Sequence, residues 1–443
     1  MRVVVVGAGL AGLSAADSLS RVGVEVELIE AGRRVGGRTR TVRDRFAHGQ
    51  YAESGAEWVD TTHLRVHELM DRYGIRVHGE GMQWTTIRRW LFWDDHLRDE
   101  RDLPELEPGL AEAIEAYEES VDRHAEEMLD ASRPQDHPRA AELDALSLAD
   151  MMRRARLGPA ASLFARRNSQ GEFASEPERV SVLFVAQQRA QENEVLARTG
   201  IELRAHRVAG GVSAVAERLA DEVMARPNVR LRFSTEVTRI VLDVDGTRVS
   251  TNEGDIDADH VVLAAPLRAV GRIRIDDLPS LLREAIDELG YGTITKTAVQ
   301  FASRQWRPGY GTTASVSQRL YDCSVEQGGE AGILMSYCGG DGGDALGDST
   351  EDERIEAIAA DMRVVHGIAG PPVGAFSRSW TAKSRYGGAY AVYEPGQVTR
   401  YWEVLRQPVG RLHLAGEHVA TCTGYMEGAV ESGRTAAERI IAG

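Results

Sequence analysis

Apolar and polar residues alternate in a strand–helix–strand pattern over the first thirty positions. The run Val3–Val6 is apolar and ends in glycine, which predicts a buried parallel strand. Residues 10–21 carry apolar side chains at helical spacing, and Gly23 after them predicts the end of a helix. Residues 25–30 predict a second strand. The pattern therefore predicts one βαβ unit at the start of the chain.

The pattern changes several times beyond this unit. Glu, Ala, Leu and Arg at helical spacing predict a helical insert over about residues 99–165, which Pro134 and Pro138 interrupt. The following stretches predict a helix over 180–191, a turn and a helix over 206–223, strands over 229–263, a strand over 293–301, a Gly/Asp loop over 339–347, a strand over 412–415 and a final helix over 424–441. Strands that alternate with helices favour the α/β class.

The composition narrows the classes of protein. The 443 residues suffice for two to three domain-sized units, and 42% hydrophobic with 27% charged residues is ordinary for a soluble globular protein. The net charge of −16 disfavours nucleic acid and anionic membranes as partners. No run approaches ~18 apolar residues, and the opening strand lacks the features of a secretory signal, so we expect no membrane span.

Cysteine and lysine are both scarce. Cys323, Cys338 and Cys422 follow neither a metal-binding nor a disulfide spacing, so we expect no metal and three reduced thiols in the cytoplasm. The 52 basic residues comprise 50 arginines and only 2 lysines, Lys296 and Lys383. Arginine cannot serve as a compact, titratable donor, whereas lysine can. A lysine kept in such a chain therefore marks a position of interest.

A glycine-rich turn joins the first strand to the first helix. Gly7, Gly9 and Gly12, with Leu10 and Ala11 between them, form the pattern GxGxxG. The spacing allows a tight turn, close approach of backbone to a pyrophosphate, and close packing of helix on strand. The helix N-terminus then offers free N–H groups to phosphates. This context predicts a dinucleotide site.

Two features after this turn separate the candidate dinucleotides. Glu30 ends the second strand, where a carboxylate accepts hydrogen bonds from ribose hydroxyls. After Ala31, the stretch 34–38 reads Arg-Val-Gly-Gly-Arg, and the guanidinium groups of Arg34 and Arg38 suit a diphosphate. GxGxxG, then Glu, then RxGGR with Gly37 resembles the FAD-binding signature of the flavin amine oxidase superfamily, which implies FAD.

The resemblance extends along the chain. Residues 54–59 are similar to the family's flavin-contacting loop, residues 208–211 to its re-entry into the FAD domain, and residues 414–418 and 424–430 to its C-terminal flavin segment. It implies a discontinuous Rossmann-like FAD-binding domain and a substrate domain of a mixed β-sheet flanked by helices. The cofactor-binding residues that it adds are Gly55, Ala56, Glu57, Trp58, Val237, Gly416, Glu417, Gly424, Tyr425 and Met426.

The same resemblance implies the chemistry. The family's enzymes pass a hydride from the carbon beside a neutral amine to flavin N5, and O2 reoxidises the flavin to give H2O2. By resemblance, Tyr390 and Tyr425 form an aromatic cage for the amine, Lys296 holds a water against flavin N5, and Trp380 packs beside them. Ring faces attract an amine without offering a proton. Residue 389 is alanine where the monoamine oxidases bond a cysteine to the flavin, so we expect non-covalent FAD.

The substrate is less well defined. The flavin loop lacks the arginine with which L-amino acid oxidases hold a carboxylate, although Arg204 is an alternative carboxylate partner. Asp60 matches an acidic position of the polyamine oxidase tunnel and is a candidate for a distal ammonium. The remaining pocket candidates are Phe184, Gln188 and Tyr337.

Three functions stay open at this point. The first is an FAD-dependent amine oxidase with a small amine and O2 as reactants. The second is a flavin-dependent desaturase or protoporphyrinogen-type oxidase, and the third a flavin-binding protein without catalysis. We expect the FAD domain to comprise residues 1–80, 205–285 and 386–443, and the substrate domain to comprise 81–204 and 286–385. A homodimer is left open.

Overall fold

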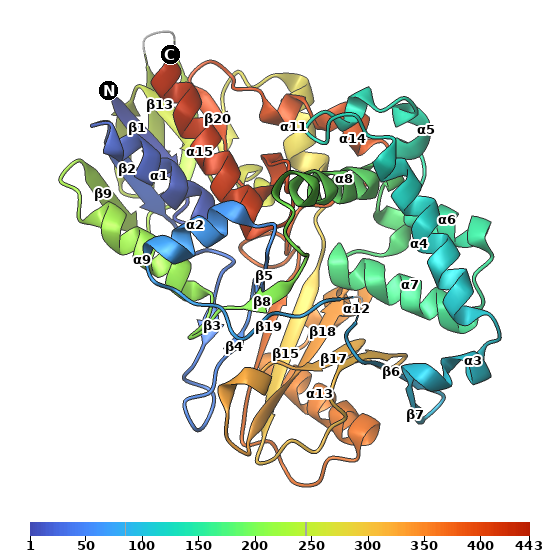
Figure 1. Ribbon diagram of the computed structural model, residues 1–443. Helices are drawn as coiled ribbons and strands as arrows, with labels where there is room; N and C mark the ends of the chain where they lie inside the picture. The colour runs from blue at the N-terminus through green and yellow to red at the C-terminus, as the bar shows by residue number, and fades with distance from the viewer. Residues whose placement is uncertain (85, 244–245) are drawn as a thin grey trace.

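A five-stranded parallel sheet forms the centre of one half of the molecule (Figure 1). The computed structural model describes residues 1–84, 86–243 and 246–443. The strand order β20-β13-β1-β2-β9 brings together distant stretches, with bounds Leu412–Leu414, His260–Leu263, Arg2–Val6, Glu25–Glu30 and Val229–Phe233. Val3, Val4 and Val5 of the central strand are fully buried, as expected for a strand covered on both faces. The predicted βαβ unit is therefore confirmed.

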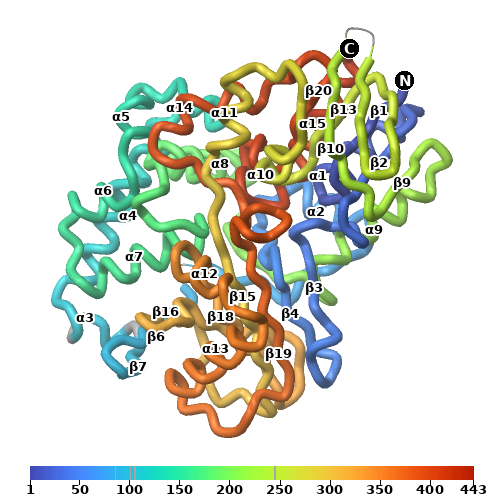
Figure 2. Tube along the Cα trace, turned by 180° about the vertical axis from the view of Figure 1, so that it is seen from behind, coloured from blue at the N-terminus to red at the C-terminus, as the bar shows by residue number. Residues whose placement is uncertain are grey.

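Four helices lie against this sheet: α1 (Leu10–Arg21), α2 (Leu64–Arg72), α9 (Ser213–Met224) and α15 (Met426–Ala442). The first and last helices of the chain, α1 and α15, can pack closely because a glycine lies at their contact. A Cβ at Gly433 would lie 2.1 Å from the carbonyl oxygen of Ala11. Figures 1 and 2 accordingly place both chain termini at the same end of the molecule.

A seven-stranded mixed sheet forms the other half. Its order β19-β15-β18-β17-β16-β6-β7 corresponds to Gly374–Trp380, Ile294–Phe301, Gly332–Gly339, Arg319–Asp322, Tyr310–Thr313, Arg89–Trp93 and His96–Asp99. All eight residues of β15 are buried, and the predicted strand over 293–301 is confirmed to within one residue. Helix α13 (Glu351–His366) packs on this sheet, and its N-terminus is capped by Thr350 with Glu353.

Smaller sheets join the two halves. A four-stranded sheet has the order β12-β11-β10-β14, with bounds Gly254–Ala258, Thr247–Thr251, Val237–Leu242 and Arg274–Ile275. Two short pairs complete the strands: β3 (Thr41–Val42) with β4 (Ala52–Glu53), and β5 (Trp58–Asp60) with β8 (Ala205–Arg207). The second pair links the flavin-loop segment to the return of the chain at residue 205.

The predicted helical insert is present and runs further than expected. It contains α3 (Leu103–Leu106), α4 (Leu110–Glu126), α5 (Ala140–Asp144), α6 (Leu148–Ala155) and α7 (Pro159–Glu172). Pro134 starts a short 3-10 turn between α4 and α5, as a residue without an N–H does at a helix start. Helix α8 (Val182–Thr199) follows and is longer than the predicted 180–191.

The Gly/Asp loop predicted over 339–347 is wrong. Residues Gly340–Gly347 form helix α12, although four of its eight residues are glycine. Tertiary contact explains this helix, because a Cβ at Gly343 would lie 2.4 Å from the carbonyl oxygen of Cys338. Glycine is unfavourable in a helix interior, but it permits α12 to lie directly on β15 and β18.

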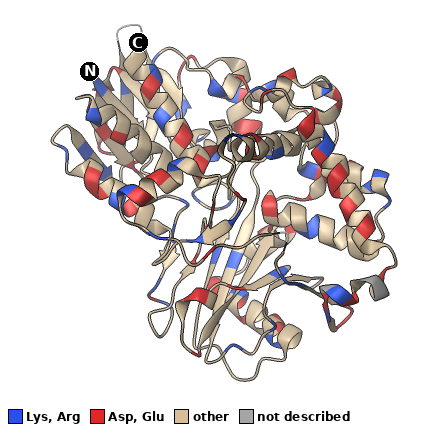
Figure 3. Cartoon of the chain, viewed as in Figure 1, with Lys and Arg blue, Asp and Glu red and all other residues tan. Residues whose placement is uncertain are grey.

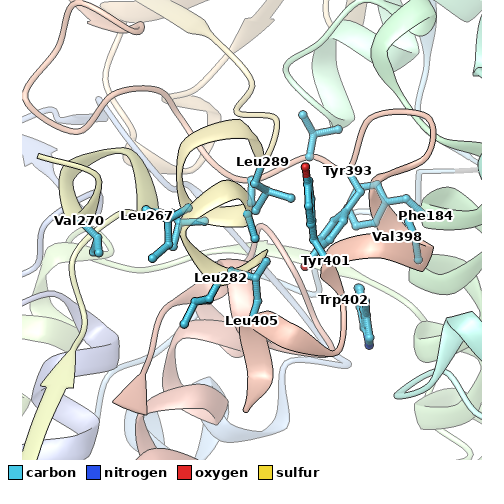
Figure 4. Packing of buried hydrophobic residues seen from close by; sticks show 14 of the residues in the cluster. Phe184, Leu267, Val270, Leu282, Leu289, Tyr393, Val398, Tyr401, Trp402 and Leu405 are labelled. Atoms are coloured by element: carbon cyan, nitrogen blue, oxygen red, sulfur yellow. The ribbon is translucent and has the colours of Figure 1, made fainter. Parts of the chain in front are cut away.

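The remaining helices, α10 (Leu267–Val270), α11 (Ser280–Glu288) and α14 (Gln397–Tyr401), belong to a core that they share with the parallel sheet and the helical insert. Figure 4 shows Leu282 beside Leu405, and the rings of Tyr393 and Trp402 on the side of the cluster where Val398 and Phe184 lie. The ring centroids of Tyr393 lie 5.3 Å from those of both Phe184 and Trp402. This packing fixes the chain just after residue 390, next to the candidate site.

Charged side chains of both signs alternate over the helices (Figure 3). All three cysteines are buried and free. Within the described ranges, none of the helices combines the length and the apolar character needed to cross a membrane.

Candidate active site

The glycine-rich turn leads straight from β1 into α1. Gly7 has a φ of +106°, a left-handed conformation that favours glycine, and its N–H donates to the carbonyl oxygen of Ile29 at 2.7 Å. A Cβ at Gly12 would lie 1.9 Å from the carbonyl oxygen of Gly7. Gly9 precedes the helix and provides no side-chain cap, so Leu10 and Ala11 present the open N-terminal turn. The turn thus has the geometry of a phosphate cradle.

Glu30 lies beside this turn. Its Oε2 accepts the N–H of Ala8 at 3.0 Å, and its Oε1 accepts the N–H of Gly32 at 2.7 Å. These bonds hold the carboxylate at the carboxyl end of β2, where the ribose of a dinucleotide lies in this fold. A cavity of about 950 Å³ opens next to it, with Glu30, Ala31, Arg34 and Trp380 among its lining residues.

The wall of this cavity is basic in an acidic protein. Its lining arginines are Arg33, Arg34, Arg40, Arg378 and Arg385. In the described part of the chain, 36 ion pairs have a nitrogen–oxygen distance of 4 Å or less. None of them involves these five arginines. Guanidinium groups without an acidic partner suit the charge of a diphosphate. Of these five, only Arg34 was predicted from the sequence; Arg33, Arg40, Arg378 and Arg385 were missed, because arginine is common throughout this chain.

The two arginines of the RxGGR stretch have different tasks. Arg34 donates to the carbonyl oxygens of Val35 at 2.9 Å and Thr39 at 3.1 Å, and also to that of Gly37, so its guanidinium organises its own loop. Arg38 donates through Nη1 to the carbonyl oxygen of Ala389 at 2.9 Å and to the Glu417 carboxylate at 2.6 Å. The structure therefore uses both in part to hold the protein itself together.

Glu417 joins the C-terminal segments to this arginine. Its carboxylate is buried and also accepts the N–H groups of Gly424 at 3.1 Å and Ala391 at 3.3 Å. Gly416 before it has a φ of +141°, and its N–H donates to Ser432. The segments at 389–391, 416–417 and 424 are thereby fixed on Arg38. Met426 follows as the first residue of α15. Val237 begins β10 directly after Glu236, which lines the cavity beside Glu30.

The flavin-loop segment packs against the same place. A Cβ at Gly55 would lie 1.9 Å from the carbonyl oxygen of Arg38, whose oxygen accepts the N–H of Ala56 at 3.1 Å. Trp380 is buried, and its Nε1 donates to the carbonyl oxygen of Ser54 at 2.6 Å. The position of this loop therefore depends on glycine at 55.

Lys296 occupies the middle of β15 and points to the flavin loop. Its side chain is 2% exposed. The ammonium Nζ donates to the carbonyl oxygen of Gly55 at 3.2 Å and to Oε2 of Glu57 at 2.7 Å. Trp58, next to Glu57, lies under the guanidinium of Arg207, whose Cζ is 4.3 Å from the ring centroid.

The structure brings three tyrosines together beside Lys296. The hydroxyls of Tyr390 and Tyr337 lie 3.2 Å apart, and the Tyr390 hydroxyl donates to the carbonyl oxygen of Glu172 at 3.0 Å. Tyr425 follows Gly424, whose Cβ would lie 3.5 Å from the Tyr390 ring. Burial raises the pKa of both Tyr390 and Tyr425 above the usual range, so both hydroxyls stay neutral.

The predicted pocket residues divide into two groups. Asp60 lies near the tyrosines: its Oδ2 is 3.6 Å from Nε2 of His63, whose ring centroid is 5.2 Å from that of Tyr425. Gln188 donates to the carbonyl oxygen of Thr421 at 3.4 Å. Phe184 is buried in the central core, 5.9 Å from Phe173 between ring centroids.

Arg204 lies elsewhere. Its guanidinium donates to Glu202 at 2.8 Å and to the carbonyl oxygen of Glu80 at 3.3 Å. It lines a second cavity of about 580 Å³ together with Trp58 and Tyr310. A substrate carboxylate would have to compete with Glu202 for this arginine, so the geometry does not favour that role.

Two carboxylates near the tyrosines were not found from the sequence. Glu172 ends α7, and Glu192 lies one turn after Gln188 on the same face of α8. Burial raises the pKa of Glu172, raises that of Glu192 to about 7, and raises that of Asp60 to about 6. The charges of all three act on the Tyr425 hydroxyl. Each is one acidic residue among many in the sequence, so no local pattern distinguishes it.

Comparison with known proteins now tests the resemblance. The profile of the family described as flavin containing amine oxidoreductase matches residues 10–441. The chain belongs to this family. A putative flavin-containing monoamine oxidase, AofH, of Mycobacterium tuberculosis is 30% identical over 99% of this chain and 96% of its own length. Amine oxidase [flavin-containing] A of Equus caballus is 28% identical over 99% of this chain and 84% of its own length.

Solved structures agree. A putrescine oxidase double mutant superposes with a TM-score of 0.84 at 25% identity, covering 100% of both chains. Cyclohexylamine oxidase from Brevibacterium oxydans IH-35A has the same fold, with a TM-score of 0.84 at 24% identity, covering 100% of this chain and 98% of its own. The predicted family, fold class and flavin cofactor are confirmed. The chain is an oxidoreductase that acts on amines.

The mode of flavin attachment follows from residue 389. Ala389 offers a methyl group, and its backbone is fixed by bonds to Arg38 and Gly292. Cys422 is buried, and burial raises the pKa of its thiol well above the usual range, which makes it a poor nucleophile. FAD is therefore held without a covalent bond.

Precipitation with acid is expected to release the flavin from this protein. Acid unfolds the chain, and a cofactor held only by hydrogen bonds and packing then stays in solution. The supernatant is expected to be yellow, with the absorbance and fluorescence of free FAD. A yellow pellet that keeps its flavin after washing would contradict non-covalent binding.

Two glycines of the turn should respond differently to alanine. Gly12→Ala places a methyl against backbone, so we expect it to destabilise the fold by about 1–3 kcal/mol. Gly9→Ala meets no atom within 4 Å at a φ of −77°, so we expect wild-type folding with weaker FAD binding. Thermal unfolding and FAD titration of both variants measure the two effects. Equal stabilities of the two variants would refute the assigned role of Gly12.

Proposed function

We propose that the protein is an FAD-dependent amine oxidase whose substrate carries a second cationic group. The observation that carries this proposal is the set of three carboxylates whose charges act on the Tyr425 hydroxyl. On the other side of the cage, Tyr337 contacts both the Tyr390 hydroxyl and the Lys296 ammonium. Bound FAD supplies the acceptor for a hydride equivalent from the carbon next to the amine, and O2 then takes the electrons to give H2O2. The imine product hydrolyses to a carbonyl compound and ammonia or an amine.

The residues of the chain supply binding, orientation and exclusion of water. The α1 N-terminus, Glu30 and the unpaired arginines of the cavity would hold the phosphates and ribose of FAD. The rings of Tyr390 and Tyr425 attract the amine and orient its lone pair. Their hydroxyls are neutral, so they neither protonate nor deprotonate the amine. Lys296 provides an N–H donor beside the flavin loop. Burial of these groups excludes bulk water from the reacting carbon.

The second cationic group is supported by the charges beyond the tyrosines. Asp60, Glu172 and Glu192 are close enough to one another to influence the Tyr425 hydroxyl together. An ionised carboxylate is the natural partner of an ammonium in a partly buried site. Putrescine oxidase, which resembles this chain over its full length, is named for a diamine.

Anaerobic reduction of the flavin tests the reaction. The purified yellow protein is mixed without O2 with a diamine, a monoamine of equal length, an L-amino acid, a porphyrinogen and a polyene. We expect the diamine to bleach the flavin absorbance fastest, and air to restore it with formation of H2O2. Bleaching only by the porphyrinogen or the polyene would instead support a desaturase-type oxidase, and the absence of any bleaching a protein without catalysis.

The preference for a diamine should depend on pH. Asp60 and Glu192, with raised pKa values of about 6 and 7, are protonated below these values and ionised above them. A distal ammonium stays charged across this range, so its binding should strengthen as pH rises from ~5.5 to ~8.5. We expect the ratio of kcat/KM for diamine over monoamine to rise by roughly tenfold across this window, about 1.4 kcal/mol.

Glu192→Gln should flatten this pH dependence. Glu194→Gln serves as the matched control on the same helix, because its side chain accepts the N–H of Ala131 and a glutamine oxygen can do the same. A ratio that stays constant with pH in the wild type, or that changes equally in both variants, would rule out a carboxylate site for the second cation.

Other sequence predictions stay predictions. The division into an FAD domain (1–80, 205–285, 386–443) and a substrate domain (81–204, 286–385) agrees with the membership of the two large sheets. The cytoplasmic location and a homodimer also remain proposals.

A further inference from the structure

Glu57 has three side-chain partners inside the protein. Its Oε2 accepts Nζ of Lys296 and the hydroxyl of Tyr321, each at 2.7 Å. Its Oε1 accepts Nε of Arg207 at 3.0 Å. The side chains of Glu57 and Lys296 are 3% and 2% exposed. The carboxylate therefore has a complete set of donors without help from solvent.

The strands hold these partners in place. Glu57 immediately precedes β5, and Trp58 pairs with Arg207 of β8. Lys296 and Tyr321 project from β15 and β17 of the seven-stranded sheet. The cluster thus bridges the flavin loop and the substrate sheet. Because its partners lie on rigid strands, Glu57 holds the Lys296 ammonium in a fixed position.

The cluster is balanced in charge. Lys296 and Arg207 contribute two positive charges, and Glu57 and Glu326 two negative charges, with Arg207 Nη1 3.1 Å from Glu326. Burial alone would raise the pKa of Glu57, but Lys296 and Arg207 outweigh it and lower that pKa to about 2. The two cations therefore favour the ionised form of Glu57.

Other titratable groups face this pair. They are Glu53 on β4, Tyr310 on β16, Tyr321 on β17, Tyr337 on β18 and Cys323. Burial raises the pKa of Glu53 to about 7, whereas it raises the pKa of Tyr321 and Cys323 well above the usual range. Glu53 is the member of this set that titrates near neutrality. Because the charges of Glu57 and Lys296 both act on it, its pKa should fall in Glu57→Gln and rise in Lys296→Met.

We propose that Glu57 is a positioning residue for Lys296, which it holds as a charge-balanced N–H donor instead of an isolated cation beside the flavin. This inference rests on the proposed function, in which Lys296 faces the cofactor. Glu57 was assigned to the cofactor loop from sequence, but its partner in the fold is the lysine 239 positions away.

A structural role alone does not account for the pair. Buried ion pairs contribute little net stability, because desolvation of the two charges offsets their attraction. The chain otherwise uses arginine, yet a lysine is retained here with a carboxylate against it. A balanced pair instead controls the field at a redox group, since an unbalanced positive charge in a buried site favours the electron-rich reduced form and an unbalanced negative charge disfavours it.

Glu57→Gln should therefore raise the reduction potential of the flavin. The amide keeps the shape and an acceptor oxygen but leaves Lys296 with an unbalanced charge. As pH rises, Glu53 ionises beside the pair and supplies the missing negative charge. The difference in potential between variant and wild type is expected to be positive at pH ~6 and to vanish towards pH ~9.

The experiment is a spectroelectrochemical titration of the flavin in the holoenzyme over this pH range. It compares wild type, Glu57→Gln, Lys296→Met and the double variant, which together form a double-mutant cycle. Without Lys296, burial favours the neutral form of Glu57. If Glu57 acts as the partner of Lys296, its replacement is therefore expected to shift the potential less in the Lys296→Met background than in wild type. Tyr321→Phe is the matched control, because it removes a neutral donor to the same oxygen and should leave the potential unchanged.

Several outcomes would overturn the inference. These are an unchanged potential in Glu57→Gln at every pH, a shift of equal size in the Lys296→Met background, or an equal shift in Tyr321→Phe. If Glu57→Gln does not retain flavin, Glu57→Asp keeps the charge and is expected to keep the wild-type potential; a positive shift there contradicts the proposal. Failure of the proposed function is separate, since it shows as wild-type flavin that no amine bleaches.

Discussion

The ion pair between Arg38 and Glu417 is the contact on which the site depends. One guanidinium from the N-terminal loop meets a carboxylate that lies 379 residues later and is buried. The same carboxylate accepts backbone N–H groups beside Tyr390 and Tyr425, so both rings take their places from it. Burial alone would lower the pKa of the Arg38 guanidinium. The Glu417 carboxylate outweighs this effect, so the pKa of Arg38 is raised. Loss of either partner would leave an uncompensated buried charge.

The charges around this centre are separated by sign. The cavity next to Glu30 is lined by five arginines without ion-pair partners among the described residues. The space beyond the tyrosines has Asp60, Glu172 and Glu192 instead. The balanced cluster of Glu57 and Lys296 lies between the flavin loop and the substrate sheet. An acidic protein thus keeps a basic region for an anionic cofactor and an acidic region for a cationic substrate.

The sequence was informative where the pattern was local. The βαβ unit follows from apolar runs and glycines within thirty residues, and the family follows from motifs of five to seven residues. Helix α12 was missed because glycine propensity argues against a helix, while contact with Cys338 of β18 requires glycine at 343. The pairs Glu57–Lys296 and Arg38–Glu417 join residues hundreds of positions apart, and no local rule links them. Phe184 was predicted to line the pocket. The direction in which its side chain packs depends on Tyr393 and Trp402, which are distant in the sequence.

The scarcity of lysine has a practical consequence for chemical labelling. Lys296 is enclosed, whereas the side chain of Lys383 is 73% exposed and lies at the rim of the cavity beside Glu30. Reagents that acylate amines thus meet one lysine side chain on the surface, together with the N-terminal amine. A fluorophore attached there would sit next to the cofactor cavity without any engineered cysteine. The arginine-rich composition leaves Lys383 as the exposed lysine side chain that can carry a reporter of cofactor exchange.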